Sequence, residues 1–225
     1  EQLPKELKKK FDEYQIETVI HEHCDKSKIA TYIKRYNEHS SMNTNQKAFT
    51  YIDKFANRIR KIMDNRFFLE CSVYSDNDNE KGAVERVIVE TVMCINHFDA
   101  WSRQAKTLFQ YVNDFGTDGE FDKLEETICR LGNIVTEDIK EIFNKKDSFI
   151  FITLFDRFTK LGIGDVRFAA FLRAFQSDLR QTGRNKNGFL FDEIKQNKST
   201  KSRQVIIDKL ELLENLMHDF IERSS

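Results

Sequence analysis

AVERVIVETVMCINHFDAWSRQAKTLFQYV, residues 83–112, determines which fold we expect for this chain of 225 residues. A surface helix of a globular protein carries one apolar stripe, whereas apolar residues recur here at helical spacing over more than one face. The stretch therefore predicts a long helix at the centre of a bundle. The sequence GTDG at residues 116–119 marks its end.

The composition favours helices throughout the chain. One Pro and 8 Gly stand beside 32% charged residues, and the 40% hydrophobic residues include 20 Phe. Helices tolerate Lys and Glu, whereas sheets with tight hairpins need turn residues. We therefore predict a mainly α protein, a multi-helix bundle, with enough residues for one large domain or two small ones.

Shorter helical patterns flank the central segment, and capping residues mark their ends. Upstream, we predict helices at Pro4–Glu13, from a cap at Asp25 or Ser27 to about Asn37, and from Asn43 or Thr44 to about Asp64. Downstream, we predict helices at Phe121–Leu131, Thr136–Phe143, Ser148–Leu161, Asp165–Gln181 and Ser199–Ile221. The stretch Ser75–Lys81 is predicted to be a polar loop.

One segment departs from the helical pattern. From Tyr14 to His23, apolar and polar residues alternate with the period of two that is typical of a strand. A single strand is not stable in water, and the remaining sequence offers no convincing partner. We therefore expect a short N-terminal strand that is separated from the rest of its sheet.

Overall charge and cysteine usage point to no particular partner. The formal net charge is -1 and the pI is near 6.6, so binding to nucleic acid or anionic lipid requires a local patch. No apolar run approaches the ~20 residues that span a bilayer, and no secretory signal is present. The four cysteines stand far apart. We expect a cytoplasmic protein with reduced thiols and no membrane partner.

The sequence contains no catalytic signature of the Walker, HExxH or GxSxG type. His21 and His23 share a strand face beside Cys24, as a metal-binding pair does, but no third ligand is assignable. We therefore predict no metal site and no catalytic residue. Acidic residues such as Asp156 are expected at helix caps or on polar helical faces.

Basic residues gather around the loop between the last two predicted helices. They can supply phosphate contacts, and Phe189 and Phe191 among them can stack on unpaired bases, so the sequence suggests a nucleic-acid-binding patch. The alternative is that both Phe residues anchor the loop to the bundle while the lysines are solvated. The basic residues are Arg173, Arg180, Arg184, Lys186, Lys195, Lys198, Lys201 and Arg203.

The segment LPKELKKKFDEYQIETVIHEHCDKSKIATYIKRYNEHSSMNTNQK, residues 3–47, resembles part of a known family. Its pattern is an LP-containing helix, a strand that ends in an acidic turn, a short helix that ends in Tyr36 and Asn37, and then Met42 and Asn43. This order is similar to the latter part of the ParB/sulfiredoxin-like domain in the bacterial family that includes GmrSD-type phage-restriction proteins. The connector departs from the family, which often has Gly and Pro where His39 and Ser41 stand.

The resemblance implies that this chain is the C-terminal part of a longer protein. The family's Asp-Gly-x-Arg-type motif, which is associated with nucleotide hydrolysis or nicking, would precede Glu1 and is absent here. Residues 1–43 would be the remnant of a ParB-like α/β domain, and residues 44–225 a helical bundle domain. The resemblance places Asn37 nearest the family's nucleotide pocket, with Arg35 beside it. Asn37 also suits a helix cap, and Arg35 also suits a surface position.

Three functions remain open at this point. The first is a helical scaffold or recognition region of a ParB-like antiphage or DNA-modification-associated protein, not catalytic by itself. The full-length protein would then be a nucleotide hydrolase or nuclease and would hold the nucleotide, with no cofactor in this chain. The second is a stand-alone protein-interaction or homo-oligomerisation module with an apolar seam along Val205–Ile221. The third is a nucleic-acid-binding helical domain.

Overall fold

The computed structural model of the chain describes residues 20, 22–36, 42–194 and 199–223. This part is mainly helical and contains no sheet, which confirms the predicted fold class. The predicted helix Pro4–Glu13 and most of the predicted strand Tyr14–His23 lie outside the described residues. Glu22 and His23 are described and are not in a strand.

The chain divides into two compact units, Glu1–His39 and Ser40–Ser225, close to the boundary that we predict after residue 43. In the first unit, α2 spans Lys26–Tyr36. The Oδ1 atom of Asp25 accepts a hydrogen bond of 2.8 Å from the backbone N–H of Lys28, as expected of a helix N-cap. The origin of this unit in a ParB-like domain stays a prediction.

The second unit contains helices that differ widely in length. They are α3 (Thr44–Phe49), α4 (Ala56–Met63), α5 (Arg66–Glu70), α6 (Asp76–Glu80), α7 (Ala83–Asn96), α8 (Ala105–Phe115), α9 (Asp118–Ile134), α10 (Ser148–Thr159), α11 (Asp165–Ala174), α12 (Arg180–Thr182) and α13 (Arg203–Arg223). Two 3₁₀ turns, η1 (Phe98–Ala100) and η2 (Lys140–Ile142), and a π-helical turn, η3 (Phe175–Leu179), complete them.

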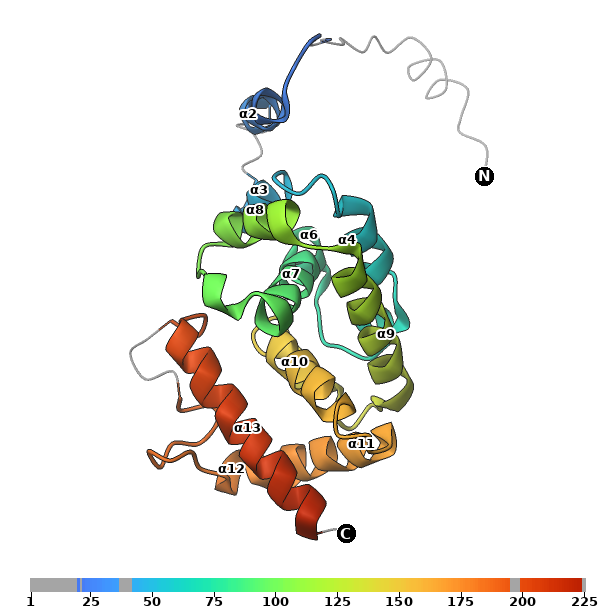
Figure 1. Cartoon of the computed structure of the whole chain (residues 1–225), viewed down its shortest axis with the longest axis vertical. Coiled ribbons are helices and arrows are strands. Elements are labelled where there is room, and N and C mark those ends of the chain that lie inside the picture. The colour runs from blue at the N-terminus through green and yellow to red at the C-terminus, as the bar shows by residue number, and fades with distance from the viewer. Residues whose placement is uncertain (1–19, 21, 37–41, 195–198, 224–225) are drawn as a thin grey trace, which may run out of the picture. The chain divides into compact units, whose positions relative to one another are not determined.

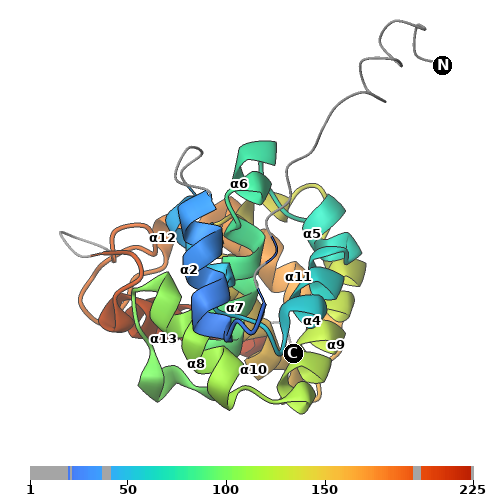
Figure 2. The same cartoon turned by 90° about the horizontal axis from the view of Figure 1, so that it is seen from above.

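Helices α7 and α10 form the centre of this unit (Figure 1). They contact each other, and α10 also contacts α9, α11 and α13. Figure 2, seen from above, shows α4, α5 and α9 on one side of α7 and α12 and α13 on the other. Phenylalanine fills the centre, since α10 alone contributes the buried rings of Phe149, Phe151, Phe155 and Phe158. The expectation that the helix beginning at Ala83 lies at the centre of the bundle is confirmed for α7.

The single helix that we predict over residues 83–112 is wrong beyond Asn96. At His97 the backbone leaves the α-helical region, with φ −134° and ψ 34°, and after the 3₁₀ turn η1 an α-helix resumes only at Ala105. The interruption places the Trp101 ring against the Phe149 ring, with centroids 5.6 Å apart and planes at 13°. A straight helix would not bring these two rings together, so tertiary packing overrides local periodicity.

The helix predicted from Asn43 or Thr44 to Asp64 is also wrong, because it is divided into α3 and α4. Asn43 caps α3 as expected. Beyond α3, the Oδ1 atom of Asn113 accepts hydrogen bonds from the backbone N–H groups of Asp53 at 3.0 Å and Lys54 at 3.1 Å. A side chain 60 residues away thus replaces the helical acceptor.

Three smaller expectations need correction. Residues Ser75–Lys81 are not a loop, because a capping box formed by Ser75 and Asp78 starts the short helix α6. Only η2 forms within the helix predicted at Thr136–Phe143, where the Thr136 hydroxyl bonds to the Asp138 carboxylate instead of supporting a helix. The last helix begins at Arg203 rather than at Ser199.

Candidate functional site

A cavity of about 300 Å³ opens where the turn before α10 approaches α6, α12 and α13. This volume is at the lower end of the range for small-ligand sites. Most of the lining is charged or polar. The lining residues are Val73, Asp78, Asn144, Lys145, Lys146, Asp147, Arg180, Asp192, Thr200 and Lys209.

Lys209 and Asp147 form the most buried ion pair of this lining. The Nζ atom of Lys209 lies 2.7 Å from Oδ1 of Asp147, and their side chains are 5% and 11% exposed. The Lys209 ammonium also lies 4.0 Å from the centre of the Phe191 ring. A buried ion pair is often no more stable than apolar residues of the same size. Its position in a cavity wall makes the pair a candidate binding feature.

Two further ion pairs hold the walls of the cavity. The Nζ atom of Lys145 lies 2.7 Å from Oδ1 of Asp78, and this hydrogen bond lowers the pKa of the Asp78 carboxyl group. The Arg180 guanidinium binds both Asp192 oxygens, at 2.8 and 3.1 Å, and this contact raises its pKa. Both cations are thereby fixed in position.

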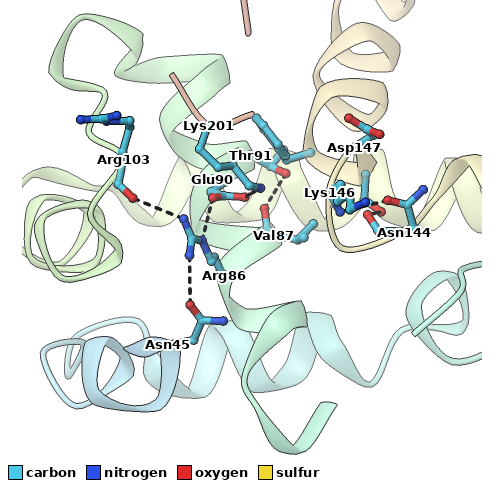
Figure 3. Close-up of polar contacts among 12 residues, drawn as sticks. Asn45, Arg86, Val87, Glu90, Thr91, Arg103, Asn144, Lys146, Asp147 and Lys201 are labelled. Atoms are coloured by element: carbon cyan, nitrogen blue, oxygen red, sulfur yellow. Dashed lines mark hydrogen bonds and ion pairs between the residues drawn. The ribbon is translucent and has the colours of Figure 1, made fainter. Parts of the chain in front are cut away.

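Lys146 completes the charged lining and differs from the other cations. It is exposed, and its side chain has no carboxylate partner among the described residues. The lining therefore contains four cationic and three acidic side chains, an excess of one positive charge. Figure 3 shows Lys146 beside Asn144 and Asp147, in the turn that precedes α10.

A second charged cluster surrounds Glu90, which is fully buried in α7 (Figure 3). Its Oε1 atom lies 2.8 Å from Nε of Arg86, and its Oε2 atom lies 2.5 Å from Nζ of Lys201. The Lys201 ammonium lies 4.1 Å from the centre of the Phe149 ring, and the Lys201 carbonyl accepts a bond from the Trp101 indole. Glu90 thus connects the central helix to the segment before α13.

Each described member of the predicted basic patch contacts an acidic residue. Lys195 and Lys198 lie outside the described residues. The pairs are Arg173 with Asp138, Arg180 with Asp192, Arg184 with Glu193, Lys186 with Glu211, Lys201 with Glu90 and Arg203 with Asp99. These carboxylates reduce the positive field that nucleic acid would meet. Nucleic-acid binding by the patch stays a prediction.

The expectation of solvated lysines is wrong for Lys201, whose side chain is only 15% exposed. The two Phe residues of the loop anchor it, as the alternative reading predicts. Phe191 is buried against the rings of Phe151 and Phe175, and Phe189 packs against the core. The described part of the loop up to Ile194 is therefore packed against the bundle through Phe189 and Phe191.

The remaining candidates fall in the first unit. Asn37 and His21 lie outside the described residues, and the structure gives only the backbone of Arg35, within α2. The nucleotide-proximal role of Arg35 and Asn37 stays a prediction. In residues 20, 22–36, 42–194 and 199–223, no group of three His, Cys, Asp or Glu side chains could hold a metal ion.

Sequence reasoning missed Glu90, Asp147 and Lys209. Glu90 stands within the apolar run VIVETVM, whereas Lys209 directly follows Asp208 and Asp147 directly follows Lys146. A charged residue within an apolar stretch of a central helix is a usable signal, because such residues are rarely buried without a partner. Arg86 stands four residues before Glu90 and is a partner that helical spacing offers, whereas Lys201 and the pairing of Asp147 with Lys209 join residues that are distant in the sequence.

The expectation that Asp156 lies at a helix cap or on a polar helical face is wrong, because it is buried within α10. Its side chain is 1% exposed on α10 and contacts Nζ of Lys123 at 2.7 Å and Nζ of Lys160 at 2.9 Å. Burial opposes ionisation of this carboxyl group, but the two lysine contacts outweigh burial and lower its pKa below its ordinary value of 3.8. Asp156 is a structural carboxylate that joins α10 to α9.

We expect the contribution of Asp156 to depend on pH. A depressed folded-state pKa contributes stability above the unfolded value of 3.8 and loses it as the pH falls through the folded value. Asp156→Asn should therefore lower the free energy of unfolding by about 1 kcal/mol at neutral pH, since both lysines are largely exposed. Urea unfolding across the acidic range measures this difference, which should vanish below the folded pKa. A constant difference at every pH would contradict it.

A scan of protein-family models gives no match to this chain, and searches of curated proteins and of solved structures find no similar protein. The fold and the site alone therefore define its class, an all-α bundle with a charged cavity. Every helix in the described part of the chain is too short or too polar to cross a membrane.

Proposed function

We propose that this chain is a helical recognition scaffold that is not catalytic by itself and that binds a ligand in the charged cavity. The observation that carries this proposal is the buried Lys209–Asp147 pair in the cavity wall. Three ion pairs fix the lining before any ligand arrives, which reduces the cost of ordering on binding. A site whose side chains are ordered before binding is suited to the recognition of a ligand.

The alternative of an oligomerisation module has less support, because the apolar stripe of α13 faces the protein's own core. Val205, Ile206, Leu213 and Met217 are buried, and α13 contacts α10 and α11. The stripe is thus covered without a second copy of the chain. The scaffold function needs no free apolar seam.

The biological setting that we propose comes from the resemblance of residues 3–47. It is a ParB-like protein of phage defence or DNA modification, in which a separate segment would supply nucleotide hydrolysis or nuclease activity. The described bundle would then be the region that recognises a ligand and supports the catalytic domain.

We expect the purified chain to show no turnover of nucleoside triphosphates and no cleavage of plasmid DNA with Mg²⁺ or Mn²⁺. Phosphate release and gel mobility measure the two reactions, and a commercial nuclease and a phosphatase serve as positive controls. Turnover that copurifies with the chain, scales with its concentration and disappears in Lys209→Met would overturn the scaffold proposal.

A further inference from the structure

We propose that the cavity binds a phosphate-type oxyanion, either as a free ion or as the phosphoryl group of a larger ligand. This inference rests on the recognition function proposed above and names the ligand chemistry of the same site. It begins from the charge of the lining, in which four cationic side chains face three carboxylates.

The carboxylates of the lining are already occupied. Asp147, Asp78 and Asp192 contact Lys209, Lys145 and Arg180, respectively. A cationic ligand would have to displace one of these lysines or the arginine, whereas an anionic ligand adds to the excess positive charge. The ion pairs of the lining therefore favour an anionic ligand over a cationic one.

The cations retain hydrogen-bond donors for such an anion. An ammonium group has three N–H donors. Lys209 directs one of them to Asp147 and lies against the face of Phe191. Among the described residues, the Lys145 ammonium contacts one acceptor, Asp78, and the Lys146 side chain contacts none. An oxyanion with several acceptor oxygens can engage two or three of these groups at once.

The start of α10 adds to this field. This helix has 12 residues, and the residues immediately before it, Asn144 to Asp147, line the cavity. The N-terminal end of a helix carries a partial positive charge that favours anions. Lys145 and Lys146 stand in the same turn. The N-terminal end of α10 and the side chains of Lys145 and Lys146 thus both favour a negatively charged ligand at this side of the cavity.

Isothermal titration calorimetry at low ionic strength tests the proposal with inorganic phosphate and, separately, with adenosine monophosphate. We expect saturable binding of at least one probe. Tighter binding of phosphate identifies a free ion as the ligand, and tighter binding of the nucleotide identifies a phosphoryl ester. Both results support an oxyanion site.

Lys146→Gln provides the decisive variant, because the side chain is exposed and its removal leaves all three ion pairs intact. We expect at least a tenfold weaker affinity for the bound probe, with an unchanged circular dichroism spectrum. Lys61→Gln is the matched control: this exposed lysine on α4 pairs with Glu125 and does not line the cavity. It should bind like the unmodified chain.

Two results would overturn the proposal. One is the absence of saturable binding by both probes, and the other is an equal loss of affinity in Lys146→Gln and Lys61→Gln, which would indicate a general charge effect. Failure here is distinguishable from failure of the scaffold proposal. Missing phosphate binding leaves the chain a non-catalytic scaffold, whereas turnover removes the scaffold function even when phosphate binds.

Discussion

Phe151→Ala should lower the free energy of unfolding by about 3 to 5 kcal/mol, the cost of a large cavity in a packed core. Phe151 is 1% exposed in the first half of α10. Its ring lies 5.4 Å from the ring of Phe175 and 5.6 Å from the ring of Phe191. Truncation therefore removes contacts with two segments that follow α10 in the chain.

The same substitution should also weaken anion binding. Phe191 lies beneath the Lys209 ammonium, so a shift of its ring into the vacated space alters a wall of the cavity. This effect is indirect, because Phe151 does not line the cavity. We expect a measurable loss of phosphate affinity in Phe151→Ala under conditions where the variant is still folded.

Urea unfolding, followed by circular dichroism, measures the change in the free energy of unfolding. An unchanged slope of this free energy against urea concentration shows that the folded state stays compact. Phe115→Ala is the matched control, because the Phe115 side chain is 61% exposed on α8. Its cost should be below about 1 kcal/mol. Equal costs for Phe115 and Phe151 would show that the α10 ring cluster is not the stabilising core.

The positions of several helices follow from the sequence because their signals are local. The apolar run after Ser148 gives α10, and the pattern from Phe121 gives α9, although α9 begins three residues earlier, at Asp118, where Thr117 and Glu120 form a capping box. The interruptions do not follow from local signals. The backbone of Asp53 is held by Asn113, and helical periodicity contains no information about a partner so distant in the chain.

The site was predictable only in part for the same reason. Arg180 and Lys201 were singled out as basic residues, but as parts of a surface patch. Arg180 pairs with Asp192 in the cavity wall, and Lys201 forms a buried ion pair with Glu90. The sequence alone does not distinguish a solvent-exposed lysine or arginine from a buried one, because only the fold determines which of these side chains are buried.

Lys201→Met should lower the free energy of unfolding by about 3 kcal/mol. Removing one partner of a buried ion pair leaves the other charge poorly compensated in a medium of low polarity. Glu90 is fully buried, and Lys201 is the cation that reaches it from outside α7. Arg86 stays in contact with Glu90, which keeps the expected cost at the lower end of the usual range.

A double-mutant cycle measures the interaction energy of Lys201 and Glu90 separately from the effect of replacing each residue alone. Replacing Glu90 by Met as well removes the stranded carboxylate, so the double variant should be more stable than Lys201→Met alone. Lys186→Met is the control, since its ammonium pairs with Glu211 on the surface at 3.1 Å. That substitution should cost less than about 1 kcal/mol. A double variant no more stable than Lys201→Met would contradict the buried-pair interpretation.

The salt dependence of the same variants distinguishes a buried pair from a surface pair. Added salt screens exposed charges and leaves buried ones nearly unaffected. The cost of Lys201→Met should therefore persist in high salt, while any cost of Lys186→Met should fall. Thr200 lines the cavity and directly precedes Lys201, so the Glu90 contact also holds part of the cavity wall. Phosphate affinity should accordingly fall in Lys201→Met and stay unchanged in Lys186→Met.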